Sequence, residues 1–156
     1  MKRALATLIL AALAGCPTAG VHRPSLELRL AASPALPRVG DTLRLTATLA
    51  NPHAEAIEVE ARCTPPVVFS VVAADRSRTA HRTSESWPCG VAGPRIRIAP
   101  GDSVRFTDAW VADAEGAFTA TASIGEHYVV RGGRRDFKTG HAFAPVTVRV
   151  APRQGS

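Results

Sequence analysis

The sequence is poor in aromatic residues, which make up 5% of its 156 residues and include one tyrosine and two tryptophans. A chain with so few large rings must build its core mainly from valine, leucine, isoleucine and alanine. Beyond the N-terminal segment, no window shows apolar residues at helical spacing. A helical domain is therefore not expected.

Catalytic motifs are also missing, since no Gly-x-Ser-x-Gly is present. Gly101-Asp102-Ser103 spells the start of a Gly-Asp-Ser esterase motif. That chemistry places the serine after an early strand of a much longer α/β domain. Here Pro100 precedes the motif and a strand pattern follows it, so we predict a turn and expect no enzyme.

Metal-ligand spacing is absent as well. The five histidines lie in or next to predicted loops without ligand spacing: His22, His53, His81, His127 and His141. Asp108, Asp113 and Glu115 lie close together, as calcium-binding carboxylates in loops can, but without an EF-hand pattern. For the histidines, a zinc or copper site built from distant loops is the alternative. For the three acids, solvated turn residues are the simpler interpretation and a calcium site is the alternative. We predict no metal and no cofactor.

No apolar run is long enough to span a bilayer, which takes about 20 residues. The apolar run from Ala4 to Ala14 follows Met1-Lys2-Arg3 and is closed by Leu13-Ala14-Gly15-Cys16. A charged start, an apolar stretch and small residues form the pattern of a secretory signal. The closing four residues resemble the lipobox of bacterial lipoproteins.

This resemblance implies a signal peptide over residues 1–15, cleavage before Cys16, and a diacylglycerol group on the Cys16 sulfur. Acyl chains would then anchor the protein to a membrane surface of the cell envelope. Pro17 follows, not the aspartate that retains many lipoproteins at the inner membrane, so the outer membrane is expected in a Gram-negative host. A plain signal peptide with an incidental cysteine is the alternative.

The formal charge is +6, and nearly every positive charge is an arginine. Removal of Lys2 and Arg3 with the signal peptide would lower this charge by two. The segment from Arg131 to Arg135 is suited to acidic lipid headgroups, but a solvated loop is the simpler interpretation. Without interleaved aromatics in an exported chain, no nucleic-acid partner is expected.

The chain has three cysteines, and lipidation of Cys16 leaves Cys63 and Cys89 as a pair. In an oxidising compartment outside the cytosol a disulfide is the default. Chain-entropy reasoning gives such a bridge a stabilisation of about 3–4 kcal/mol. Neither cysteine belongs to a Cys-x-x-Cys motif, so redox catalysis is not expected.

After a proline-containing tether over residues 16–24, apolar and polar residues alternate in short segments. The predicted strands are residues 26–30, 43–49, 57–63, 67–71, 95–98, 104–110, 118–124 and 146–150. We expect residues 127–130 to extend the strand 118–124. Residues 74–94 are predicted as a polar loop with at most one short strand, and residues 131–141 as a loop.

Seven to nine short strands predict an all-β, immunoglobulin-like antiparallel β-sandwich over residues 25–151, with a tail at 152–156. A small barrel is the competing all-β solution. Trp110 is in phase with Phe106 and is predicted in the core, whereas Trp87, next to Pro88-Cys89, is predicted to cover the disulfide.

A second resemblance spans residues 26–124. Its motifs are Asn51-Pro52, Phe69-Ser70-Val71, and the segment from Ile98 to Ser103 that leads to Phe106 and Trp110. In this order they resemble the intracellular proteinase inhibitor (BsuPI-type) family and, more loosely, other bacterial immunoglobulin-like modules. The resemblance implies an immunoglobulin-like fold and, as an alternative function, protease inhibition.

Together these patterns predict a non-catalytic, lipid-anchored β-sandwich that binds or supports another envelope protein. The predicted contact surface comprises the edge strands and the loop 74–94, because loops on a rigid scaffold carry binding functions. Arg76, Arg78 and Trp87 are its candidate contact residues. The alternative is a proteinase inhibitor whose disulfide-braced loop occupies a protease cleft.

Overall fold

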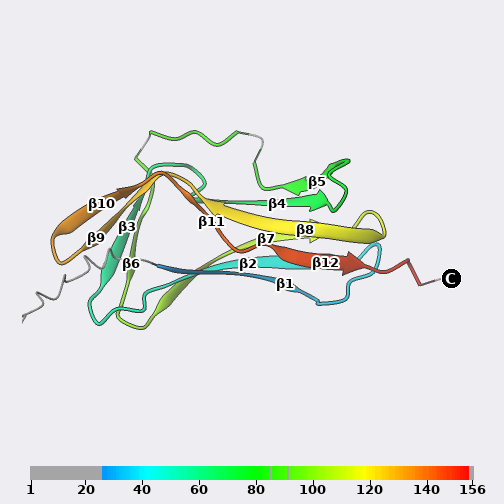
Figure 1. The fold of residues 1–156 in the computed structure, drawn as a ribbon, viewed down its shortest axis with the longest axis horizontal. Coiled ribbons are helices and arrows are strands. Elements are labelled where there is room, and N and C mark those ends of the chain that lie inside the picture. Colours follow the sequence, from blue (N-terminus) through cyan, green and yellow to red (C-terminus); the bar gives the residue numbers. More distant parts are fainter. Residues whose placement is uncertain (1–25, 85, 91, 155–156) are drawn as a thin grey trace, which may run out of the picture.

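The computed structural model describes residues 26–154 except residues 85 and 91. The predicted signal peptide, Cys16 and the tether lie outside these residues. The described part contains no helix that is long and apolar enough to span a membrane. Its twelve strands (Figure 1) are β1 (Glu27–Ser33), β2 (Thr42–Ala50), β3 (Ile57–Ala61), β4 (Val67–Ala73), β5 (Thr79–Arg82), β6 (Arg95–Ile98), β7 (Ser103–Val111), β8 (Gly116–Ile124), β9 (His127–Arg131), β10 (Arg134–Lys138), β11 (His141–Ala142) and β12 (Val146–Val150).

The strands form antiparallel sheets in the arrangement of an immunoglobulin-like β-sandwich, which confirms the predicted fold class. A three-stranded sheet, β1-β2-β7, packs against a five-stranded sheet, β11-β8-β4-β5, in which β12 also pairs with β8. A four-stranded sheet, β10-β9-β3-β6, lies at one end of this sandwich (Figure 1). It brings together segments that are far apart in the sequence.

The core follows the predicted alternation most clearly on β2. Its inward residues Leu43, Leu45, Ala47 and Leu49 are fully buried. Trp110 on β7 is also buried, and its ring packs edge-to-face on Phe118 at a centroid distance of 4.9 Å. The predicted core position of Trp110 is therefore confirmed.

Asn51 is a buried polar residue at the corner where β2 gives way to β3. Its side-chain Nδ2 donates hydrogen bonds to the carbonyl oxygens of Glu55, Ile98 and Ala99 at 2.8, 3.1 and 3.1 Å. Its Oδ1 accepts a hydrogen bond from the backbone N–H of His53 at 3.0 Å. One side chain thus satisfies the backbone groups that the bend between the two sheets leaves without strand partners.

The prediction of a loop at residues 131–141 is wrong. Gly132 and Gly133 have φ angles of 54° and 75°, and Arg131 pairs with Arg134 across them. Two consecutive positive-φ residues make the tight turn that joins hairpin strands. The glycines therefore connect β9 to β10, and β11 follows after Gly140.

The prediction that residues 127–130 extend the strand 118–124 is wrong. β8 pairs with β4, whereas β9 pairs with β3 and β10. The chain changes sheet at Gly125 and Glu126, where the carbonyl oxygen of Glu126 accepts a hydrogen bond from the N–H of Arg62 at 2.8 Å. The separate strands β9, β10 and β11 bring the total above the expected seven to nine. The short strand allowed within residues 74–94 is present as β5.

The two sides of the sandwich are closed by different kinds of contact. On the β1 side, the N–H of Val39 donates to Ala151 O at 3.0 Å, and the N–H of Ala151 donates to Pro37 O at 2.8 Å. On the β5 side, His81 Nε2 lies 2.7 Å from Asp108 Oδ2 on β7. Burial tends to raise the pKa of Asp108, but hydrogen bonds from Thr83 and His81 outweigh it and lower that pKa.

Candidate functional site

The predicted disulfide between Cys63 and Cys89 is present, with a Cα–Cα distance of 4.0 Å. Cys63 is fully buried, in phase with the inward residues of β3, and Cys89 is exposed. The N–H groups of Gly93 and Gly90 donate to the carbonyl oxygens of Ala61 and Arg62, at 3.0 and 2.9 Å. Cys89, Gly90 and Gly93 are therefore held along the extension of β3 by both the covalent bridge and hydrogen bonds.

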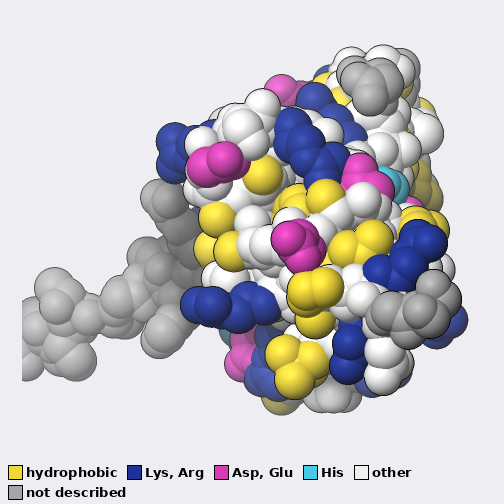
Figure 2. Space-filling view, turned by 90° about the vertical axis from the view of Figure 1, so that its right-hand side faces the viewer, with side chains coloured by type: hydrophobic (Ala, Val, Ile, Leu, Met, Phe, Trp, Pro, Cys, Tyr) yellow, Lys and Arg dark blue, Asp and Glu magenta, His cyan; other side chains and the backbone are white. Residues whose placement is uncertain are grey.

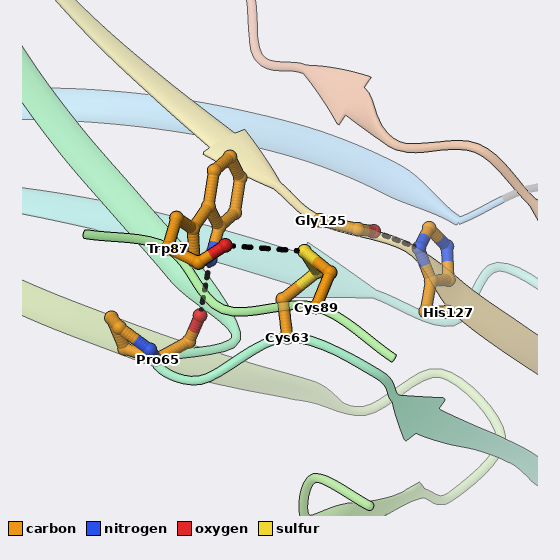
Figure 3. Close-up of a disulfide and its surroundings, with 6 residues drawn as sticks. All are labelled: Cys63, Pro65, Trp87, Cys89, Gly125 and His127. Atoms are coloured by element: carbon orange, nitrogen blue, oxygen red, sulfur yellow. Dashed lines mark hydrogen bonds between the residues drawn. A yellow bond between two sulfur atoms is a disulfide. The ribbon is translucent and has the colours of Figure 1, made fainter. Parts of the chain in front are cut away.

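Trp87 and Gly125 flank the disulfide (Figure 3). Trp87 Nε1 donates a hydrogen bond to Pro65 O at 2.7 Å, and Trp87 O lies 3.5 Å from Cys89 Sγ. A Cβ atom at Gly125 would lie 2.8 Å from Cys63 Cβ and 3.0 Å from the Trp87 ring, so only glycine fits there without displacement. Trp87 lies beside the disulfide, as the sequence predicts.

His127 is a buried histidine directly after this glycine. Its Nδ1 lies 2.7 Å from Gly125 O (Figure 3), and because a carbonyl only accepts, Nδ1 carries the hydrogen. Burial lowers the pKa of His127 below its usual value of 6.5, the Gly125 hydrogen bond opposes this effect, and the electrostatic effects of nearby His141 and Lys138 lower the pKa further. The imidazole is therefore neutral in the folded protein at neutral pH.

This lowered pKa predicts a loss of stability in mild acid. Below pH 6.5 the unfolded state takes up a proton at His127 that the folded state resists, so the free energy of unfolding should fall as the pH drops. One such proton gives a slope of at most about 1.4 kcal/mol per pH unit. Urea unfolding at about pH 7.5 and about pH 5.5 measures it.

His127→Asn serves as the control for this prediction, because the asparagine Nδ2 stands where Nδ1 donates to Gly125 O but does not titrate. The variant should lose most of the difference between the two pH values. An unchanged pH dependence would mean that another group is responsible.

The outer face of the four-stranded sheet carries alternating charge around one tyrosine. Because Ile57, Val59 and Ala61 of β3 face the core, Glu58 and Glu60 face outwards. Tyr128 on β9 and Arg95 on β6 are the direct cross-strand neighbours of Glu60.

Two arginines contact the Tyr128 ring. Arg135 Cζ lies 3.6 Å from the ring centroid, and Arg62 Cζ lies 5.8 Å from it. Arg62 Nη1 also donates a hydrogen bond to Tyr128 Oη at 3.3 Å. Glu60 accepts a hydrogen bond from Arg135 Nε at 2.9 Å and lies 3.7 Å from Arg95 Nη2. These side chains form one network across β3, β6, β9 and β10.

A hollow of about 370 Å³ opens over this network, and we call it the arginine hollow. One wall consists of loop residues held by the disulfide and the other of the sheet face. Its lining residues are Glu60, Ala61, Arg62, Gly90, Ala92, Gly93, Arg95, Tyr128 and Arg135. Three arginines line the hollow against Glu60, and Glu58 lies 3.9 Å from Arg95 Nη1. The two carboxylates leave one positive charge in excess, which favours an anionic ligand.

The structure does not bring the three predicted contact residues together. Arg76, with φ of 60°, lies in the turn between β4 and β5. Arg78 forms an ion pair with Asp113 at 2.7 Å and stacks over Phe118 at 5.6 Å. Trp87 lies near the other end of β4, beside Pro65. The hydrogen bond from Arg78 lowers the pKa of Asp113, so that carboxylate is already engaged.

Figure 2 shows the end of the sandwich that lies opposite the four-stranded sheet. Hydrophobic side chains on this end are interspersed with basic and acidic ones. The large hydrophobic residues that are most exposed in the described part are Leu36 and Val111, at 79% and 56%. We therefore place the candidate site at the arginine hollow, where a shaped cavity and an excess of one charge coincide.

Other residues singled out in the sequence have structural contacts. The Asp108 carboxylate is hydrogen-bonded to His81 and Thr83. Ser103 is the first residue of β7 and pairs with Ala50. Within residues 26–154, leaving aside 85 and 91, no group of three or more metal-ligating side chains is found.

Comparisons with known proteins find similar solved structures but no family for this chain. No family model and no curated protein matches the sequence. Similar solved structures include the putative ApaA protein from Bordetella pertussis, at a TM-score of 0.45 and 14% identity over 81% of this chain and 90% of that chain. The CARDB domain of the PF1109 protein from Pyrococcus furiosus matches at 0.42 and 12% identity, over 83% and 96% of the two chains. The ASH/PapD-like domain of human CEP192 matches at 0.39 and 9% identity, over 99% and 100%.

Proposed function

We propose that this protein is a non-catalytic, lipid-anchored module of the bacterial cell envelope that binds another envelope protein through the arginine hollow. The observation that carries the proposal is the hollow itself, whose loop wall is fixed by the Cys63–Cys89 bridge. A loop that is already ordered loses less conformational entropy when a partner binds.

The lipobox resemblance supports the anchored part of this proposal. Glu27, at the start of β1, pairs with Ala50, next to the corner that leads into the four-stranded sheet. The chain therefore enters the fold at the same end as the arginine hollow. The short segment from Cys16 to Leu26 would reach about 35 Å when extended, at about 3.5 Å per residue. The hollow would thus lie close to the membrane surface.

Two measurements in the host test this function. A radioactive fatty acid should label the protein, and Cys16→Ser should abolish the label. A photoreactive amino acid at Ala92, in the hollow, should cross-link to a partner protein, whereas the same group at Val111, on the opposite end, should not. Absence of the label would remove the anchor, and equal cross-linking at both positions would remove the binding site.

Protease inhibition is the second candidate, and the exposure of Cys89 in a covalently held loop favours it. An inhibitory loop must stay rigid in the protease cleft. The chain should then inhibit a serine protease at a near-stoichiometric ratio, and reduction of the disulfide should abolish the inhibition. A panel of secreted and periplasmic proteases in which none is inhibited would exclude this role.

A further inference from the structure

We infer that the arginine hollow binds a carboxylate, presented by an acidic segment of the partner protein. This inference rests on the proposed function, because it names the chemistry by which that same site would recognise its partner. It depends on the hydrogen-bond donors of Arg62 and Tyr128.

Glu60 provides an internal example of the ligand. Its carboxylate, at 17% exposure, is held by Arg135 from one side and approached by Arg95 from the other. The hollow therefore already holds one carboxylate by guanidinium groups. Guanidinium groups match carboxylate oxygens in geometry and form charge-assisted hydrogen bonds with them.

Of the three arginines that line the hollow, Arg62 is the one that forms no ion pair with Glu60. No carboxylate among the described residues forms an ion pair with Arg62, whose contacts are the hydroxyl and ring of Tyr128. Tyr128 Oη accepts the Arg62 hydrogen bond, which leaves its own hydrogen to donate to a ligand. Arg62 has further guanidinium N–H donors, and its Nη1 lies 3.3 Å from Tyr128 Oη. The two side chains thus offer neighbouring donors in the lining of the hollow.

The size and charge of the hollow favour a side chain over a larger ligand. A volume of about 370 Å³ is near the lower end of the range for small-ligand sites, about 300–1,000 Å³. The carboxylates of Glu60 and Glu58 offset two of the three arginine charges, and the remaining charge suits one further carboxylate. Short acidic side chains on an extended segment meet both conditions, and inorganic phosphate is the competing ligand.

The test uses the chain from Pro17 on, which keeps the whole fold because the hydrophobic core comes from residues between Leu26 and Val150. The probes are the peptide N-acetyl-Glu-Glu-Glu-amide, its all-glutamine counterpart and inorganic phosphate. The acidic peptide should shift the NMR amide signals of Gly90 and Gly93 with a dissociation constant on the order of 1 mM. The glutamine peptide should cause no such shift.

Variants locate the binding. Arg62→Gln should raise the dissociation constant about tenfold, as expected for the loss of one charge-assisted hydrogen bond. Arg62→Lys should recover only part of the affinity, because lysine keeps the charge but lacks the planar fork. Tyr128→Phe should raise the constant about threefold by removing one neutral donor. Arg105→Gln, an exposed arginine on β7, is the matched control and should leave binding unchanged.

Three results would overturn the inference: equal binding of the glutamine peptide, equal effects of Arg62→Gln and Arg105→Gln, or binding of phosphate without the acidic peptide. These failures would leave the fatty-acid label and the cross-links at Ala92 intact. Conversely, an unlabelled Cys16 would remove the anchored role, while binding of the acidic peptide at Arg62 would still support the chemistry of the hollow.

Discussion

Asn51→Ala should lower the free energy of unfolding by about 3–4 kcal/mol. The substitution removes the donors to the carbonyl oxygens of Glu55, Ile98 and Ala99 and the acceptor for the N–H of His53. Each buried polar group left without a partner costs about 1–3 kcal/mol. Because Asn51 is 1% exposed, water cannot replace these bonds without opening the corner. Urea unfolding followed by circular dichroism measures the loss.

The variant Asn51→Asp distinguishes the effect of losing the Nδ2 donor from the effect of losing side-chain volume. Aspartate has nearly the same shape and keeps an acceptor for His53, but it replaces the Nδ2 donor by an oxygen facing three carbonyl oxygens. It should therefore destabilise the fold at least as much as alanine does at neutral pH. If aspartate were tolerated, the corner would not depend on the Nδ2 hydrogen bonds.

Removal of the disulfide should have an effect of similar size. The double variant Cys63→Ala, Cys89→Ala removes a cross-link between two residues that are 26 positions apart in the sequence. The free energy of unfolding should fall by about 3–4 kcal/mol in the chain-entropy account. Alanine at position 63 also leaves a gap in fully buried surroundings next to Gly125. Denaturant unfolding of the variant, compared with the unsubstituted chain, measures this loss.

A reducing agent provides the control for the disulfide. It should lower the unfolding midpoint of the unsubstituted chain and leave that of the double variant unchanged. The amides of Gly90 and Gly93 should also lose part of their protection from exchange, since the bridge holds their segment along the extension of β3. A midpoint that does not respond to reduction would contradict a stabilising role of the bridge.

The strands of the sandwich could be predicted where one face of a strand is buried and the other is polar. On β2, the alternation from Leu43 to Leu49 is complete in the sequence, and the structure buries each predicted residue. A one-residue shift of register would move the whole apolar set to the surface. Period-two patterning therefore determines both the strand and its orientation.

The hairpin of β9 and β10 was missed because β10 lacks that signal. On β10 the polar Asp136 faces inwards, opposite Val129, and the apolar Phe137 faces outwards and is 45% exposed. The alternation of polar and apolar residues is therefore the reverse of that expected for a half-buried strand. The informative residues were the two glycines at 132 and 133. A glycine pair between extended segments is a strong indication of a tight hairpin turn, and the high charge around it obscured this interpretation.

Only part of the candidate site could be predicted from the sequence. The alternation along β3 already places Glu60 on the outer face, and the disulfide could be assigned from cysteine count. In the structure Glu60 has Tyr128 as its neighbour on one side and Arg95 on the other. Both contacts result from pairings between strands that are distant in the sequence. A single sequence does not contain such register information, since each strand pattern fits several neighbours.

The different closure of the two sides of the sandwich has a consequence for how the layers separate. Main-chain bonds between Val39, Ala151 and Pro37 close one side, whereas the side chains of His81 and Asp108 close the other. Side-chain contacts at a partly exposed edge exchange with water more easily than backbone ladders do. We therefore expect the two sheets to separate first along the β5 edge, while the backbone hydrogen bonds on the β1 side stay formed.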